Sequence, residues 1–67
     1  MASTTIAILS NQEIVLRAIA AANRVEQDYL TCGYTPGRAA HEAAIQYDQT
    51  EAALMRERAR ILNGAAR

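Results

Sequence analysis

The sequence contains no tryptophan, phenylalanine or lysine, and it has one proline, one cysteine and one histidine. With Cys32 alone the chain cannot form an internal disulfide, and with His41 alone it cannot build a histidine-based metal cage. The longest apolar run near the N-terminus, residues 6–9, is too short for a membrane span or a signal peptide. We therefore expect no cofactor, no metal and no membrane partner. The lone thiol and the missing targeting signal predict a cytoplasmic protein.

The sequence also has no excess of positive or negative charge, because its seven acidic and seven basic residues cancel. Such a chain has no overall attraction to nucleic acid or anionic lipid. Apolar residues are abundant and make up 51% of the 67 residues. Many of them are alanines, however, and an alanine side chain buries little area. A single domain of this size buries only about 60% of its unfolded surface. Such domains often gain the missing burial by oligomerising or docking on a partner, so we expect a protein that binds other protein chains.

The start of a first helix is marked by a capping box. The Ser10 hydroxyl can accept from the backbone of Glu13, whose carboxylate can reach back to Ser10. Leu9 and Ile14 occupy the two positions of a hydrophobic staple. These signals together predict a helix over residues 11–31.

A turn follows, with signals for the end of one helix and the start of the next. Gly33 fits the left-handed position after a helix end, and Tyr34 would then lie near Tyr29. Thr35 can cap a second helix, and Pro36 fits its first position, where the missing N–H costs nothing.

The predicted fold is therefore all-α, an antiparallel two-helix hairpin, because so short a link favours antiparallel neighbours. The expected parts are one domain with an extended N-terminal arm (1–9), a helix (about 11–31), a turn (32–35), a helix (about 36–62) and a frayed tail (63–67).

Each predicted helix has an apolar side when its residues are placed at about 100° steps. The stripe on the first helix has the spacing of a coiled coil and comprises Val15, Ala18, Ala22, Val25, Tyr29 and Cys32. The main stripe on the second helix comprises Ala40, Ala44, Tyr47, Leu54, Ile61 and Leu62. The expected neighbours across the hairpin are Val25 with Ala44, the Ala21/Ala22 pair with Tyr47, and Val15 with Leu54 and Met55. The arm is expected to cover the end of the second helix through Ile6, Ile8 and Leu9.

Both helices have more apolar width than one mutual contact uses, which predicts an intermolecular seam. Glu51 and Arg58 fall inside the apolar arc of the second helix. They are interpreted either as a pair that fixes register in a dimer or selects a binding partner, or as a solvated edge from which Arg58 extends into water. The predicted protein-binding seam comprises Leu16, Ile19, Leu30, Ile45, Tyr47, Glu51, Met55, Arg58 and Ala59. The alternative is that the crossing angle and the arm cover these residues.

No catalytic residue is expected. His41 and Glu42 begin a zinc-like motif, but Ile45 stands where the second histidine would be. Cys32 lies at a helix C-terminus, where the dipole disfavours a thiolate, so it is predicted to be a small core residue. The arginines near the C-terminus do not share one face, which argues against a stripe that tracks phosphates; they are Arg56, Arg58 and Arg60.

The resulting hypothesis is a non-enzymatic interaction module that dimerises or joins a hetero-complex, as a co-chaperone, an inhibitor or a small assembly subunit. In length and in its Gly- and Pro-containing turn, the layout is similar to that of the hairpin co-chaperones of type III secretion needle subunits; no sequence motif distinguishes among these roles. The alternative is a ribbon-helix-helix DNA-binding regulator or antitoxin with residues 4–9 as its strand. That strand lacks side chains suited to reading base edges, and the helices are long for such a fold.

Overall fold

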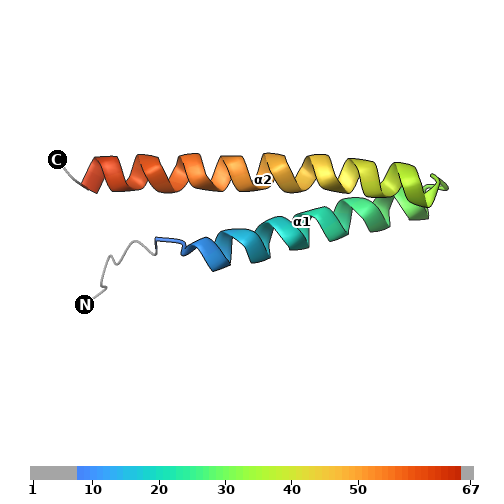
Figure 1. Cartoon of the computed structure of the whole chain (residues 1–67), viewed down its shortest axis with the longest axis horizontal. Coiled ribbons are helices and arrows are strands. Elements are labelled where there is room, and N and C mark those ends of the chain that lie inside the picture. The colour runs from blue at the N-terminus through green and yellow to red at the C-terminus, as the bar shows by residue number, and fades with distance from the viewer. Residues whose placement is uncertain (1–7, 66–67) are drawn as a thin grey trace.

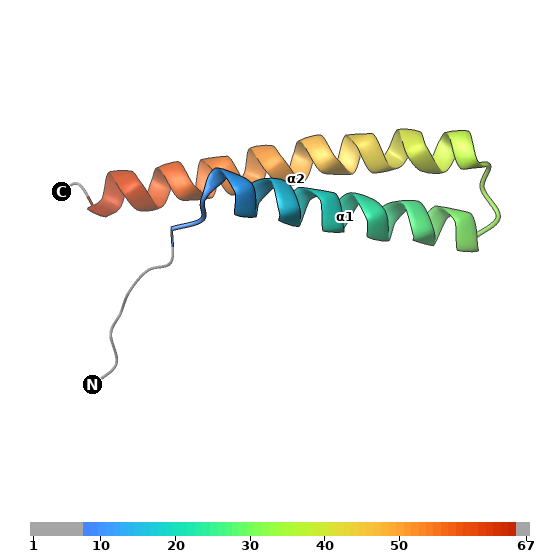
Figure 2. The same ribbon diagram turned by 60° about the horizontal axis from the view of Figure 1, so that its bottom comes forward.

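The computed structural model describes residues 8–65 and consists of two antiparallel helices. They are α1 (Asn11–Thr31) and α2 (Pro36–Ala65), which lie side by side in a single layer (Figure 1, Figure 2). The longer α2 extends beyond the start of α1 (Figure 1). The predicted all-α hairpin is confirmed, with α1 and the turn at the predicted residues. The predictions for residues 1–7, which include most of the arm and Ile6, and for residues 66 and 67 lie outside the described residues.

The capping box at the start of α1 is confirmed. The Ser10 hydroxyl accepts from the Glu13 N–H at 3.1 Å, and the Ser10 N–H donates to Glu13 Oε1 at 3.0 Å. The two hydrogen bonds satisfy two donors that a helix start otherwise leaves without partners. The hydrogen bonds from Ser10, backbone first and then side chain, lower the pKa of Glu13, and the charge of Arg17 adds to this effect.

The end of α1 is closed by a Schellman motif centred on Gly33. The Gly33 N–H donates to the Leu30 carbonyl and the Tyr34 N–H donates to the Tyr29 carbonyl, both at 3.0 Å. Gly33 has φ of +92°, a left-handed conformation that favours glycine. The predicted contact of Tyr34 with Tyr29 is confirmed, with ring centroids 4.8 Å apart.

The start of α2 follows the prediction, whereas its end does not. Thr35 Oγ1 accepts from the Arg38 N–H at 3.1 Å, and Pro36 is the first helical residue. The helix continues to Ala65 instead of stopping at Asn63-Gly64. Gly64 remains helical and does not adopt the positive φ of a helix-ending glycine.

The line along which α2 faces α1 differs from the predicted stripe. Ala39 is fully buried and Ala43 half-buried, whereas the predicted Ala40, Ala44 and Leu62 are exposed. At 39–40 and at 43–44 the sequence has two adjacent alanines, so a count of apolar residues cannot decide which one faces inward.

Polar residues also lie on this inward line of α2. Gln46 Nε2 donates to Thr50 Oγ1 at 3.0 Å, and both residues are half-buried. Because each supplies a partner for the other, their partial burial leaves no orphaned group there. Sequence reasoning missed them because it selected only apolar residues for the core.

The interior between the helices is small. Only Ile14, Ala18 and Ala39 are fully buried hydrophobic residues among those described, and Ile14 alone is large. Cys32, predicted to be a core residue, is exposed. It caps the C-terminus of α1, where the chain already turns away from the space between the helices.

Arg58 fixes the register of the two helices. Its Nη1 donates to the Leu9 carbonyl at 3.2 Å and to Asn11 Oδ1 at 2.7 Å. Asn11 and Arg58 therefore lie at one level of the hairpin. Since both helices rise about 1.5 Å per residue, equal steps along them put Ala22 level with Tyr47. This agrees with the predicted placement of small residues opposite the Tyr47 ring.

Candidate functional site

The hairpin has two sides whose residues differ in chemistry. Ala18 in α1 and Leu54 in α2 face the opposite helix, and the next residue in each, Ile19 and Met55, lies about 100° further around. The helices run in opposite directions, so this rotation carries both side chains to the same side of the hairpin. The residues immediately before each inward position therefore gather on the other side. The inward positions, which face the opposite helix and are buried or half-buried, are Ile14, Ala18, Val25, Tyr29, Ala39, Ala43, Tyr47, Thr50, Leu54, Arg58 and Ile61.

We call the first side the apolar face. It is defined by the residues that follow inward positions, which are Val15, Ile19, Glu26, Leu30, Ala40, Ala44, Asp48, Glu51, Met55, Ala59 and Leu62. Leu16 and Ile45, one position further on from Val15 and Ala44, lie at its outer rim. The large apolar side chains here are well exposed, from 38% at Leu30 to 56% at Leu16. No single mutual contact between α1 and α2 covers them.

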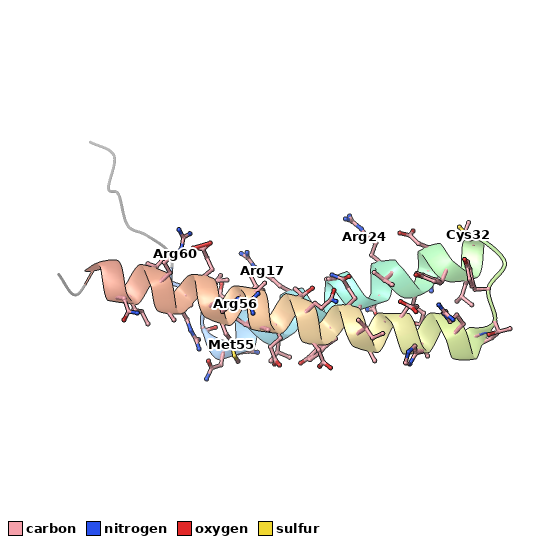
Figure 3. The ribbon with its side chains drawn as sticks, turned by 90° about the horizontal axis from the view of Figure 1, so that it is seen from above. Arg17, Arg24, Cys32, Met55, Arg56 and Arg60 are labelled. Atoms are coloured by element: carbon pink, nitrogen blue, oxygen red, sulfur yellow. The ribbon has the colours of Figure 1, made fainter. Side chains whose placement is uncertain are left out.

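We call the opposite side the arginine face. It is defined by charged residues that precede inward positions, which are Glu13, Arg17, Arg24, Asp28, Arg38, Glu42, Glu57 and Arg60. Figure 3 shows Arg17, Arg24 and Arg60 pointing to one side of the hairpin and Met55 to the other. Two ion pairs lie on this face, Arg38 with Glu42 at 3.1 Å and Arg60 with Glu57. Its basic and acidic residues are equal in number.

The apolar face carries charge of one sign. Glu26 and Glu51 are half-buried beside the inward line, and Asp48 is exposed. Within residues 8–65, no basic group lies within 4 Å of these three carboxylates. The arginine face is thus balanced in charge and the apolar face is acidic, while Arg56 and Arg58 belong to neither set.

The predicted seam residues lie on this side or at its border. Leu16, Ile19, Leu30, Ile45, Met55 and Ala59 are exposed on the apolar face or its rim. Tyr47 and Arg58 occupy inward positions and are half-buried, with Glu51 next to them. Arg58 uses its guanidinium within the chain, a role that sequence reasoning did not consider. The only available signal for this role was that Arg58 falls inside the apolar arc of α2.

Two open hollows lie mainly outside the apolar face. One open hollow is on the side of the arginine face and is lined by Ala20, Ala21, Arg24, Val25 and Gln46. Another lies on the outer surface of α2 and is lined by Arg56, Ala59, Arg60, Asn63 and Gly64. Neither encloses a set of groups suited to acid–base or nucleophilic chemistry.

Two further findings bear on the class of site. Among the described residues, no three His, Cys, Asp or Glu side chains group closely enough to hold a metal ion. His41, whose neighbours in sequence suggested a partial zinc motif, is exposed. Within the same part of the chain, neither helix combines the length and the hydrophobicity needed to cross a bilayer.

Comparison with protein-family models, curated proteins and solved structures found no match to this chain.

Proposed function

We propose that this chain is a non-enzymatic protein-interaction module whose apolar face binds another protein chain. The observation that carries the proposal is the contrast between a minimal interior and a large exposed apolar face. Among the described residues, one large side chain, Ile14, is fully buried between the helices, whereas six others on the apolar face or its rim are at least 38% exposed.

Physical chemistry favours covering such a face. Full burial of a Leu, Ile or Met side chain contributes about 1.5–3 kcal/mol relative to leaving it exposed. A pair of helices encloses little, and small domains without disulfides or metals commonly obtain the remaining burial from another chain. A helix of a partner can lie along the apolar face, in the mode by which amphipathic helices join bundles.

The arrangement of charge supports a protein partner over nucleic acid. The ribbon-helix-helix alternative depends on residues 4–9, of which 4–7 lie outside the described residues. Two of the four arginines on the arginine face are held in ion pairs with glutamates, so that face does not form the unbroken basic stripe that binds phosphates. For the compartment we propose the cytoplasm, where a single exposed thiol such as Cys32 stays reduced.

Site-specific photo-crosslinking in the cells that make the protein tests this proposal. A photoreactive phenylalanine analogue replaces Met55 on the apolar face or, as the matched control, Ala53 on the opposite side. Both positions are exposed and lie in the same turn of α2. We expect a discrete protein adduct from position 55 and none from position 53. Equal adducts from both positions, or none from either, would contradict the proposal.

A further inference from the structure

We infer that the occupant of the apolar face is an amphipathic helix whose apolar stripe is flanked by arginine or lysine. This inference rests on the proposed function and adds the chemistry of the partner. It is carried by the three carboxylates of the apolar face, which lie among exposed apolar side chains.

These carboxylates are placed to meet cations on an incoming helix. Counting levels from Asn11 and Arg58, Glu51 lies opposite Ala18 and Glu26 lies opposite Ala43. Asp48 lies between them along the hairpin axis. The acids therefore border the exposed Ile19 and Met55 side chains instead of clustering at one end. A helix that covers the apolar residues brings its own flanking residues within reach of the acids.

The same charges disfavour a second copy of this chain as the occupant. A two-fold dimer uses the same face twice, which would bring six carboxylates into one interface. Arg58 borders this face but is already hydrogen-bonded to Leu9 and Asn11, and Arg56 follows Met55 and so lies at the outer rim, outside the set of residues that includes the acids. Like charges placed against each other across an interface are unfavourable, whereas opposite charges select the partner and speed its approach.

The arginine face supplies an internal comparison. Asp28 has the same side chain as Asp48, is also exposed and has no basic group within 4 Å among the described residues. It precedes the inward Tyr29, whereas Asp48 follows the inward Tyr47, so the two aspartates lie on opposite sides. A partner on the apolar face should respond to Asp48 and not to Asp28.

Two synthetic helical peptides of about 20 residues, long enough to lie along α1, test the inference. They share one Leu/Ile stripe and differ only in its flanks, which are arginine in one and glutamate in the other. Their affinities for the full chain are measured by fluorescence anisotropy, with Asp48→Asn, Asp28→Asn and the triple variant Glu26→Gln/Asp48→Asn/Glu51→Gln alongside. Sedimentation equilibrium of the chain alone reports self-association.

We expect the arginine-flanked peptide to bind at least about tenfold more tightly at low salt, from three partly exposed ion pairs. The preference should shrink at about 1 M salt, fall with Asp48→Asn, disappear in the triple variant and survive Asp28→Asn. Equal binding of both peptides, lost on Ile19→Glu, would overturn the inference about charge and leave the proposed function standing. A stable dimer of the chain alone would likewise overturn the inference about charge and leave the proposed function standing. Binding of neither peptide would overturn both.

Discussion

Arg58 near the end of α2 donates from one nitrogen, Nη1, to both Asn11 Oδ1 at 2.7 Å and the Leu9 carbonyl at 3.2 Å. These contacts join residues 47 and 49 positions apart, and they are made at the end of the hairpin opposite the turn. The turn therefore joins the two helices covalently at one end of the hairpin, and the hydrogen bonds of Arg58 join them at the other end. Between these two ends the helices bury little completely, and among the described residues Ile14 is the only large side chain that is fully buried.

Replacing Arg58 with alanine should weaken the hairpin. The variant loses two charge-assisted hydrogen bonds and should lower the free energy of unfolding by about 1–2 kcal/mol, measured by urea denaturation with circular dichroism. Arg56→Ala is the matched control, because Arg56 is exposed and makes no side-chain hydrogen bond or ion pair with the described residues, and it should change stability by less than about 0.5 kcal/mol. Equal effects of the two substitutions would contradict the role given to Arg58.

Gly33 in the turn and Gly37 just after it should respond in opposite directions to replacement by alanine. Gly33→Ala places a β-carbon on a backbone with φ of +92° and should cost about 1 kcal/mol. Nothing lies within 4 Å of the added atom, so backbone conformation alone causes the loss. Gly37→Ala also meets no neighbour, lies in the first turn of α2 and should stabilise by up to about 1 kcal/mol. The same urea titration measures both.

The capping box predicts acid sensitivity of α1. The hydrogen bonds from Ser10 lower the pKa of Glu13, so folding favours the carboxylate. That stabilisation is fully present above the unfolded glutamate pKa of about 4.3 and is lost as pH falls through the lower folded value. An NMR titration of the Glu13 carboxyl carbon should give a midpoint below the ordinary glutamate pKa. In Glu13→Gln, which keeps a capping side chain without the titrating group, the contribution of this residue to pH dependence should vanish.

Ile14 should be the most sensitive apolar position for the isolated hairpin. Ile14→Ala removes the only large fully buried side chain among those described and should cost about 2–4 kcal/mol. Leu16→Ala, at a position 56% exposed, should cost less than about 1 kcal/mol in the isolated chain and yet weaken binding to a partner. A larger loss of stability from Leu16 than from Ile14 would mean that the inward direction of α1 has been misassigned.

Local sequence signals were sufficient to predict the ends of α1 and the start of α2. Ser10, Gly33 and Pro36 act within a few residues of themselves, and each is found in its expected role. The end of α2 was not predicted, since Asn63 and Gly64 favour a stop without enforcing one, and the helix passes through both.

The side of α2 that faces α1 was harder to predict than the presence of the helix. Adjacent alanines at 39–40 and 43–44 give no contrast, and the half-buried Gln46 and Thr50 contribute hydrogen bonding in place of hydrophobicity. The exposed apolar residues of the predicted seam were nevertheless identified, because each lies beyond the width that one partner helix covers. Their gathering on one side, with the acids, follows from the antiparallel pairing and could be recognised only after both inward lines were known.

The central claim is that the hairpin leaves its apolar face exposed for another protein to bind. The stability of the isolated chain tests this claim most directly. Urea unfolding followed by circular dichroism, on samples shown by sedimentation equilibrium to be monomeric, gives the free energy of unfolding. We predict a value below about 3 kcal/mol, because so small an interior supplies little. A monomer that unfolds with the 5–15 kcal/mol of an ordinary domain would contradict the account, because the two helices would then be stable without covering that face.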